Sequence, residues 1–405
     1  MDFNDTPQEA AFRAEVRAWL ADNAPAFELP KGEAVDDAEE VRLGRAWLAR
    51  KTEHRYGSIL LPQDYGGRGG TIMEAVVFGE EEGRYRLPRG AYIGIGLGMA
   101  LPTIIKHGTP QQVERFVGPT LRGEMAWCQL FSEPAAGSDL AGLRTRAIKD
   151  EATNEWVVNG QKVWSSWAHL TDWGVLIARS DPAVPKHKGL TFFVVDMKSL
   201  GVEVRPIRQI SGLQDFNETF LTDVRIPDEN RIGAIGEGWA CAMTLLTGER
   251  LGQGGEGKDR GIADLIRYAA ETPRGRGTAL DSSAVRLALA SAYAEEQAEK
   301  HFQARLRTMV SRGENPGATA SIVKLAYTNR YQKMSGLAME LREMSGIAHQ
   351  PDERFTPELW YDYIWSTALR VAGGADEVLR NQISERVLGM PGEIRTDKDV
   401  PFDKL

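Results

Sequence analysis

Cysteine is scarce in this chain, and long apolar runs are missing from it. Two cysteines, Cys128 and Cys241, occur in 405 residues, which leaves no material for a disulfide framework or a cysteine-rich zinc site. We expect both thiols to be small buried apolar groups and not a redox pair. The longest apolar stretches lie near Gly189–Met197 and Val175–Ala178, well short of the roughly 18 residues that a membrane helix requires. The sequence therefore predicts no membrane association.

Signals for targeting, metal binding and nucleic-acid binding are also lacking. The N-terminal residues MDFNDTPQEAAF contain neither a basic nor an apolar stretch, so we expect no signal peptide and a cytoplasmic location. The six histidines are scattered without ligand-like spacing, which predicts no metal site. With 49 Lys and Arg against 57 Asp and Glu, the net charge is −8. Such a chain is poorly suited to neutralise the phosphates of nucleic acids.

One glycine-rich segment, Gly252–Gly257, matches the G-x-G-x-x-G pattern of nucleotide-binding loops. That function requires a strand before the glycines, whereas Ala242–Arg250 has helical character. Asp259 also stands where a phosphate-binding loop needs Ser or Thr. We therefore interpret the segment as a flexible loop.

Length and periodicity predict three domains. At roughly 150 residues per domain, a chain of 405 residues suggests two or three. Hydrophobic residues make up 42% and charged residues 26%, a balance typical of globular proteins. The pattern is helical in residues 1–125, strand-like in residues 126–234 and helical again in residues 235–405. We expect these ranges to be an N-terminal helical domain, a middle β-domain and a C-terminal helical domain.

Amphipathic stripes support the two helical domains. In the first, Phe12, Val16, Trp19 and Leu20 share one helix face, and Thr6-Pro7 before them is a typical helix start. A loop is expected at the glycines of residues 66–70. The last domain carries a second stripe, formed by Val285, Leu289, Tyr293, Phe302, Leu306 and Met309.

The middle domain is expected to be an antiparallel sandwich or barrel. Trp156–Val158 and Lys162–Trp164 flank Asn159-Gly160, a pair that fits a type I′ hairpin turn because both central residues need positive φ. Further short strands are separated by turn residues, a spacing that does not fit a βαβ series. They are expected at residues 174–178, 190–195, 202–207 and 218–226.

Three segments carry side chains suited to chemistry. Gln129–Asp139 is small, polar and glycine-bearing, so a ligand can approach its backbone closely; an ordinary surface loop is the alternative. Trp164–Trp167 places hydroxyls beside an indole that can stack on a planar heterocycle; a core tryptophan is the alternative. Glu249-Arg250 is, by itself, most simply a solvated ion pair. These residues alone leave a cofactor-binding enzyme as one open interpretation.

Together and in this order, these segments resemble the acyl-CoA dehydrogenase family of flavoproteins along nearly the whole chain. Phe131–Asp139 is similar to the family's T-E-P-x-x-G-S-D signature, and Asn159–Ser166 resembles its N-G-x-K-x-W-I-T/S segment. Further resemblances are Leu61–Gly67 to P-x-x-Y-G-G, Gly236–Trp239 to G-x-G-W/F, and Gly373–Ile383 to E-G-T-x-x-I-Q-R.

The resemblance implies a fold and a cofactor. The fold is an N-terminal helical domain, a middle antiparallel β-barrel and a C-terminal four-helix bundle. The cofactor is flavin adenine dinucleotide (FAD), with its flavin ring between the barrel and the bundle. The cofactor contacts carried over by position are Gln129, Phe131, Ser132, Ser138, Trp164, Ser165, Ser166, Arg274 and Gly374. Ser138 and Arg250 are the implied contacts to acyl-CoA, and Ala375 replaces a threonine of the family pattern.

The resemblance also implies a reaction, in which the α-proton of an acyl-CoA thioester is removed while a hydride passes from the β-carbon to flavin N5. A carboxylate must therefore lie against the α-carbon. Many family members carry this glutamate in the E-G-T segment, where this chain has Gly373. A minority carry it in a Glu-Arg dipeptide, and this chain has Glu249-Arg250 at that place. The resemblance thus assigns the base to Glu249, with Asp376 and Glu377 as alternatives.

The implied partners are acyl-CoA, electron-transferring flavoprotein and other subunits. In family homotetramers, a neighbouring chain contributes an Arg-x-x-Phe-Gly and a Gln-x-x-Gly-Gly segment to each FAD. Here residues 272–280 read TPRGRGTAL, while Arg342 and Ser345 replace Gln and Gly. Either a homo-oligomer (dimer or tetramer) uses Arg274 or Arg276 instead, or a heterotetramer contains a related subunit that supplies the missing contacts. An acyl-CoA oxidase or flavin monooxygenase of the same fold, or a non-catalytic subunit, remain alternative functions.

Overall fold

The computed structural model describes residues 5–30, 35–88, 90–252, 261–312, 314, 317–343 and 356–405. For residues 91, 249–252, 310–311 and 356–358, all in helices, this description covers the backbone alone. The chain forms two compact units. The first contains residues 1–208, 214–252 and 394–405, and the second contains residues 209–213 and 253–393.

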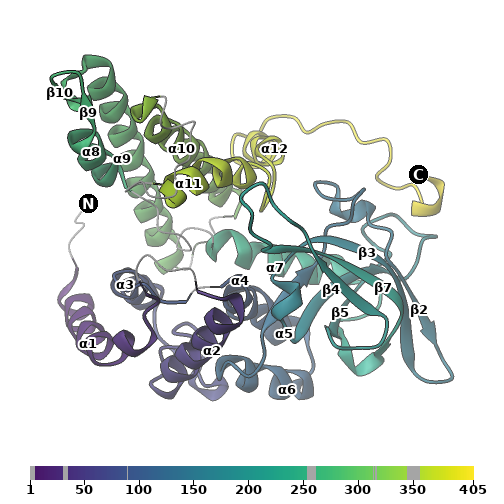
Figure 1. Ribbon diagram of the computed structural model, residues 1–405. Helices are drawn as coiled ribbons and strands as arrows, with labels where there is room; N and C mark the ends of the chain where they lie inside the picture. The colour runs from purple at the N-terminus through teal and green to yellow at the C-terminus, as the bar shows by residue number, and fades with distance from the viewer. Residues whose placement is uncertain are drawn as a thin grey trace. The chain divides into compact units, whose positions relative to one another are not determined.

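The N-terminal part of the first unit is helical, as the sequence predicts (Figure 1). Its helices are α1 (Pro7–Asn23), α2 (Asp37–Glu53), α3 (Ile72–Glu82), α4 (Ala91–Gly94), the π-helix η3 (Ile95–Ala100), α5 (Leu101–His107) and α6 (Pro110–Leu121). The start of α1 is confirmed, because the Thr6 side chain accepts from the backbone N–H of Glu9 while the Glu9 side chain accepts from that of Thr6. The predicted loop at residues 66–70 is also present.

The strands of the first unit form one eight-stranded sheet. They are β1 (Trp127–Leu130), β2 (Arg146–Asp150), β3 (Glu155–Ser166), β4 (Trp173–Arg179), β5 (Leu190–Asp196), β6 (Val202–Pro206), β7 (Phe216–Pro227) and β8 (Arg231–Ile232). Their order is β6-β7-β3-β2-β4-β5-β8, with β1 beside β4. Most ladders are antiparallel, but β1 and β2 each pair with β4 in parallel.

The hairpin predicted at Asn159-Gly160 is wrong. Strand β3 runs through both residues and pairs with β7 over its length, with an irregularity between Val158 and Gly160. A β-carbon on Gly160 would lie 2.3 Å from Oγ1 of Thr145 and 2.7 Å from its Cα. The glycine therefore permits a close approach of two backbones inside a sheet, which is the other common reason for glycine in a strand.

The sheet curls until strands that are not ladder neighbours touch. The rings of Trp156 on β3 and Phe193 on β5 lie 5.3 Å apart, although β2 and β4 separate these strands in the sheet. Buried side chains from β3, β4, β5 and β7 share one cluster on this inner face. The middle domain thus has the barrel-like interior that the sequence suggests.

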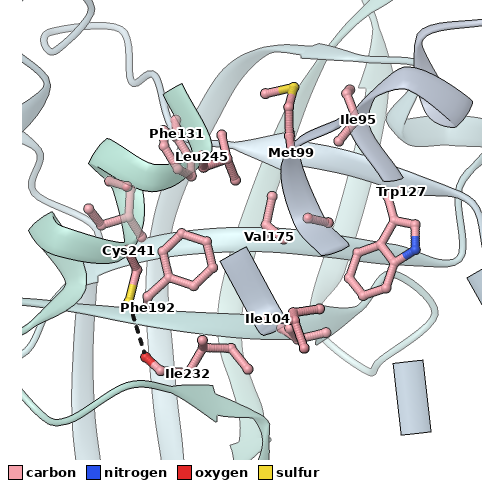
Figure 2. Close-up of a cluster of buried hydrophobic side chains, with 14 of the residues drawn as sticks. Ile95, Met99, Ile104, Trp127, Phe131, Val175, Phe192, Ile232, Cys241 and Leu245 are labelled. Carbon is pink, nitrogen blue, oxygen red and sulfur yellow. Dashed lines mark hydrogen bonds between the residues drawn. The ribbon is translucent and has the colours of Figure 1, made fainter. Parts of the chain in front are cut away.

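The outer face of β4 and β5 packs against helices (Figure 2). Along β5, Phe192 points into this second cluster and Phe193 into the first, as strand alternation requires. Helix α7 (Gly238–Gly252) contributes Cys241 and Leu245 to the outer cluster, which also contains Phe131. This packing makes α7 part of the first unit.

Both cysteines are buried and unpaired with each other, as expected. Burial raises the pKa of Cys128 to about 12 and that of Cys241 to about 11. At neutral pH neither thiol is a thiolate, so neither is a ready nucleophile or metal ligand.

The second unit is helical. Its elements are α8 (Ile262–Glu271), β9 (Pro273–Arg274), β10 (Gly277–Thr278), α9 (Ser283–Ser311), α10 (Ala320–Leu341), α11 (Thr356–Leu369) and α12 (Asp376–Arg386). The predicted stripe contributes Val285 and Leu289 to its core, whereas Tyr293 is 52% exposed. Within the described parts of the chain, no helix combines the length and apolar character needed to cross a membrane. Of the loop predicted at Gly252–Gly257, Gly252 instead ends α7, and residues 253–257 lie outside the described residues.

The boundaries of the two compact units differ from those of the three predicted domains. Helix α7, expected to open the C-terminal domain, packs with the sheet, and residues 394–405 also belong to the first unit. The domain boundaries near residues 125 and 235 stay a prediction, because packing units and family domains need not coincide.

Candidate active site

Two of the segments that the sequence predicts to be functional are hydrogen-bonded to each other. The segment after β1 contains Phe131 and Ser132, and the end of β3 contains Val163 and Trp164. The backbone N–H of Val163 donates to the carbonyl of Ser132 at 2.9 Å. The structure therefore brings together residues that lie about thirty positions apart and that the sequence analysis selected separately.

A buried ion pair fixes the same junction. Nζ of Lys162 lies 2.9 Å from Oε1 of Glu133 and also donates to the carbonyl of Phe131 at 3.0 Å. Oxygens of Glu133 further accept from the backbone N–H groups of Arg144 and Thr145 at 2.6 and 2.9 Å. These contacts satisfy both charges, so the pair connects β3 to the loop after β1.

Burial and charge act on this pair in opposite directions. Burial lowers the pKa of Lys162 to about 8, against the effect of the Glu133 carboxylate. Burial also acts to raise the pKa of Glu133, but the charge of Lys162 and the N–H donors outweigh it and hold that pKa below its ordinary value. Glu133 is therefore a structural anion at neutral pH and not a proton acceptor for substrate.

Trp164 has an unusual backbone. Its φ is 64°, a left-handed conformation that bulky residues seldom adopt. The register of β3 against β7 is irregular between Lys162 and Ser165. Bulges of this kind re-aim a side chain and are frequent beside active sites. The indole is 59% exposed and meets the edge of Phe216 at 6.2 Å, so its broad apolar surface faces outward.

The two serines after Trp164 differ in their surroundings. Ser165 is fully buried, and its Oγ has no hydrogen-bond partner among the described residues. Ser166 is half-buried. The hydroxyl of Ser166 is thus the better placed of the two to reach a bound ligand, whereas Ser165 has no exposed surface for direct contact.

Along the loop after β1, the side chains become more exposed to solvent. Phe131 is buried, and its ring meets that of Phe192 edge-on at 6.0 Å. Ser132 is half-buried, like Gln129 on β1, and Gly137 and Ser138 are exposed. A β-carbon on Gly137 would meet no described atom within 4 Å. The Gly137-Ser138 turn is therefore open to a ligand.

Helix α7 carries the predicted base and is held close to the π-helix η3. A β-carbon on Gly248 would lie 2.1 Å from the carbonyl oxygen of Gly98, so glycine at 248 allows two helical backbones to touch. Nε2 of His107 and Oγ1 of Thr244 form a hydrogen bond of 2.8 Å between α5 and α7. Figure 2 shows Leu245 of α7 in the same cluster as Phe131.

Glu249 follows Gly248 in α7, four residues after Leu245. Residues four apart share a helix face, so the backbone places position 249 next along the face that carries Leu245. The side chains of Glu249 and Arg250 lie outside the described part of the structure.

Two predicted cofactor contacts lie in the second unit. Nε of Arg274 lies 2.7 Å from Oε1 of Glu343, so this cation is paired. Gly373 and Gly374 have φ of 63° and 99°, a conformation that favours glycine. The carbonyl of Gly374 accepts from Nζ of Lys324 at 2.8 Å. A glutamate at position 373 would have to adopt this backbone or distort it.

The two alternative bases have different environments. Asp376 is buried and its Oδ2 is bound by Arg370, which makes it a structural ion pair. Glu377 is exposed at the start of α12. Neither surrounding resembles the apolar pocket that raises a catalytic carboxylate's pKa.

The residues of the first unit fit a flavin. An exposed indole held in a rare conformation offers a planar apolar face, and the half-buried hydroxyls of Ser132 and Ser166 lie on the two segments that the Val163–Ser132 bond joins. Hydroxyls and backbone N–H groups are the donors that hydrogen-bond a flavin's polar edge. Gln129 on β1 adds a side-chain amide.

Comparison with known proteins identifies the family. Models of the N-terminal, middle and C-terminal domains of acyl-CoA dehydrogenases match residues 6–124, 128–224 and 236–388. The chain belongs to the acyl-CoA dehydrogenase family. Its members are FAD-binding oxidoreductases that act on CH–CH groups. The predicted family, three-domain fold, cofactor and enzyme class are therefore confirmed.

Curated relatives match over most of this chain. Acyl-CoA dehydrogenase IpdE1 of Mycobacterium tuberculosis is 37% identical over 95% of this chain and 98% of its own length. Acyl-CoA dehydrogenase FadE34 of the same organism is 39% identical over 80% of this chain, which spans 43% of that longer protein. The solved structure named Tcur3481-Tcur3483 steroid ACAD has a TM-score of 0.81 at 26% identity and covers 97% of this chain and 100% of that one.

Several residues that build the site were not selected from the sequence. Lys162, Gly248, Gly98 and His107 act through contacts between segments far apart in the chain. Lys162 lies inside the family-like segment Asn159–Ser166, and a lysine in an apolar strand pattern signals a buried partner. Gly248 and Gly98 carry no such signal, since a close helix contact appears only in three dimensions.

Proposed function

We propose that this protein dehydrogenates an acyl-CoA thioester to the trans-2-enoyl-CoA, with Glu249 as the base that takes the α-proton. The observation that carries the proposal is the joining of the Phe131–Ser132 and Val163–Ser166 segments beside α7, the helix that contains Glu249. When bound, FAD would supply the hydride acceptor for the β-carbon. The chain's own residues would orient the thioester and hold the proton.

The position of the base has two supports. Position 249 follows a glycine in contact with η3, so its backbone has a fixed place beside the apolar cluster. The glycine at 373 has a positive φ, and the nearby Asp376 is held by Arg370. An apolar acyl chain packed against Glu249 would raise its pKa towards the working pH.

Ser138 and Arg250 are proposed to bind acyl-CoA. The exposed Gly137-Ser138 turn offers a hydroxyl and backbone donors, and anionic phosphate groups are held by such donors. Arg250 would supply positive charge near the CoA end of the thioester. Local donors of this kind are needed because the chain as a whole carries a net charge of −8 and CoA is itself an anion.

The substrate class is proposed from the relatives. The solved structure of TM-score 0.81 is named a steroid ACAD, and we propose a steroid-derived acyl chain as the first candidate substrate. Electron-transferring flavoprotein is the proposed electron acceptor. A relative that is 28% identical over 72% of this chain is named as a subunit of a caffeyl-CoA reductase-Etf complex of Acetobacterium woodii.

A heteromer is the proposed assembly. Two solved structures at 26% identity are named as pairs of proteins, Tcur3481-Tcur3483 and the ChsE4-ChsE5 complex of Mycobacterium tuberculosis. In this chain Arg274, a candidate contact to FAD, is occupied by Glu343. If the chain is expressed alone, a colourless product supports the heteromer. A yellow homo-oligomer with one flavin per chain excludes it.

The test of the proposed reaction uses the purified flavoprotein, with its partner chain if one is required. Straight, branched, aromatic and steroidal acyl-CoA thioesters are added without oxygen while the flavin absorbance is recorded. We expect at least one thioester to bleach the flavin and to yield an enoyl-CoA lighter by two hydrogens. No bleaching by any thioester, or rapid oxygen consumption in place of electron transfer to electron-transferring flavoprotein, would contradict the proposal.

A further inference from the structure

The last residues of the chain return to the sheet of the first unit (yellow in Figure 1). Phe402 donates its backbone N–H to the carbonyl of Val184 at 3.0 Å, and Asp403 donates to that of Pro182 at 3.0 Å. Pro401 forms an isolated β-bridge with Pro185. The tail, residues 397–403, is thus attached to the loop between β4 and β5.

Under the tail lies a buried cation. Arg179, at the end of β4, is 3% exposed. Its guanidinium donates to the carbonyls of Ala141 at 2.6 Å, Leu143 at 3.2 Å and Lys186 at 3.1 Å. The ring of Phe402 covers the guanidinium, with the cation 3.6 Å from the ring centroid. Arg179 therefore holds residues 141–143 and the loop between β4 and β5, and Phe402 shields it from water.

The segment held by Arg179 is the continuation of the Gly137-Ser138 turn. Asp139 follows this turn and accepts from the backbone N–H of Gly142 through its carbonyl. Nζ of Lys186 lies 3.1 Å from Oδ2 of Asp139 and 3.1 Å from Oδ2 of Asp397 in the tail. The tail thus reaches the turn by two routes, one through Lys186 and one through Phe402 and Arg179.

The turn itself is not covered by the part of the chain that the structure describes. Gly137, Ser138 and Asp139 are exposed, and a β-carbon on Gly137 would meet no described atom within 4 Å. A ligand-binding turn must be open to its ligand and yet hold its donors in place, because each donor that must be ordered on binding costs affinity. Among the described residues, Asp139 is held by Lys186, and the segment that follows it is held by Arg179.

We propose that the tail is a positioning element of the ligand site, which fixes the Gly137-Ser138 turn for a nucleotide pyrophosphate. Phe402 does this by excluding water from Arg179, since a desolvated cation binds carbonyls more tightly than a hydrated one. An aromatic face adds a direct attraction for the guanidinium. This proposal rests on the proposed function, because the tail would hold in place the turn that carries Ser138. The bound pyrophosphate would belong either to FAD or to CoA.

The test compares two truncations of the full chain. Removal of residues 401–405 deletes Phe402 and Asp403, whereas removal of Lys404 and Leu405 leaves both in place. Lys404 and Leu405 are exposed and hydrogen-bond only within the tail itself among the described residues. Asp397 and its contact with Lys186 are present in both variants, so the ion pairs of Lys186 are kept. Asp403 is lost only with residues 401–405, and the substitutions of Phe402 below leave it in place.

Phe402→Leu and Phe402→Ala complete the set. Leucine keeps an apolar cover without the aromatic face, so Phe402→Leu should lie between the wild type and Phe402→Ala. This order separates loss of the cover from a general effect of altering the chain end.

FAD content after gel filtration and titration with CoA are the readouts, because both are independent of catalysis. We expect removal of residues 401–405 to weaken binding of one of the two ligands about tenfold, with the melting temperature of the ligand-free protein little changed. A lower FAD content assigns the turn to the flavin nucleotide, and a weaker CoA affinity assigns it to the substrate. Unchanged binding of both ligands would overturn the inference, whatever the outcome for Glu249.

Discussion

Nζ of Lys162 lies 2.9 Å from Oε1 of Glu133, and both side chains are buried. The pair joins two segments that also meet at Val163 and Ser132. A glutamate and a lysine in two recognisable motifs therefore have a structural task in this chain, which is to hold the motifs against each other. Ligand contact is left to neighbouring residues with exposed surface, such as Ser132 and Trp164.

The first prediction concerns this pair. Glu133→Gln leaves Lys162 buried without its counter-ion, and we expect it to lower the free energy of unfolding by about 3–5 kcal/mol. The double variant Glu133→Gln with Lys162→Met removes both charges and should recover part of this loss. Chemical denaturation of the wild type, Glu133→Gln, Lys162→Met and the double variant measures the effect. A double variant as unstable as the sum of the two single variants would show that the residues do not interact.

The second prediction concerns pH. Because the pKa of Glu133 is lowered in the folded state, its contribution is present above the pKa of the unfolded chain and is lost as the pH falls through the folded-state value. The stability difference between the wild type and Glu133→Gln should therefore shrink under acid conditions. Denaturation at a series of pH values measures it, and a constant difference would contradict the assignment.

The third prediction concerns the contact between α7 and η3. Gly248→Ala places a methyl group where the Gly98 carbonyl lies 2.1 Å away, so the helix must shift. We expect the rate of flavin bleaching to fall by about tenfold or more, since small displacements of a base cost large factors in rate. KM should change less than kcat.

Gly98→Ala is the matched control for that contact. A β-carbon on Gly98 meets no described atom within 4 Å, so this methyl group leaves the spacing of the two helices unchanged. The control should keep the wild-type bleaching rate. Equal losses in both variants would mean that added bulk, and not helix spacing, is responsible.

The fourth prediction concerns His107. Burial, together with the charge of Lys106, lowers the pKa of His107, so the folded protein favours the neutral ring that bonds Thr244. The unfolded chain then binds more protons, and stability is lost as the pH falls below the ordinary histidine value of 6.5. The melting temperature of the wild type should fall more steeply there than that of His107→Gln. Parallel curves would refute a role for His107.

The fifth prediction concerns Trp164. Its indole is 59% exposed, so Trp164→Ala should change the stability of the FAD-free protein by no more than about 0.5 kcal/mol. If the ring packs on flavin, FAD affinity should fall about tenfold, and Trp164→Phe should retain part of it. Equilibrium dialysis measures the affinity. Unaltered FAD binding in Trp164→Ala would remove this residue from the cofactor site.

Local patterns in the sequence predict the order of elements well. The start of α1 follows from Thr6, Pro7 and Glu9, because a capping box depends on neighbours in the chain. The prediction at Asn159-Gly160 is wrong because it also used only neighbours in the chain. The pair has the local signature of a turn, but Gly160 is required by Thr145, the residue just before β2, and that contact depends on the packing of the sheet.

Contacts between distant segments set the rest of the site. Position 249 was found through a family resemblance, while the reason for its place is the meeting of Gly248 with Gly98. The tail at Phe402 gives no signal in the sequence, since a phenylalanine near a chain end has no pattern that names Arg179 as its partner. Such relationships follow from the fold, which local periodicity alone does not specify.

The central claim is that Glu249 removes the α-proton, and the most direct measurement is anaerobic flavin bleaching by an accepted acyl-CoA in Glu249→Gln. Glu377→Gln is the control, because Glu377 is the exposed carboxylate close to Gly373 and Gly374. We predict that Glu249→Gln retains FAD and binds the thioester but does not bleach, whereas Glu377→Gln bleaches at the wild-type rate. Normal bleaching in Glu249→Gln, or its loss in Glu377→Gln, would contradict the account.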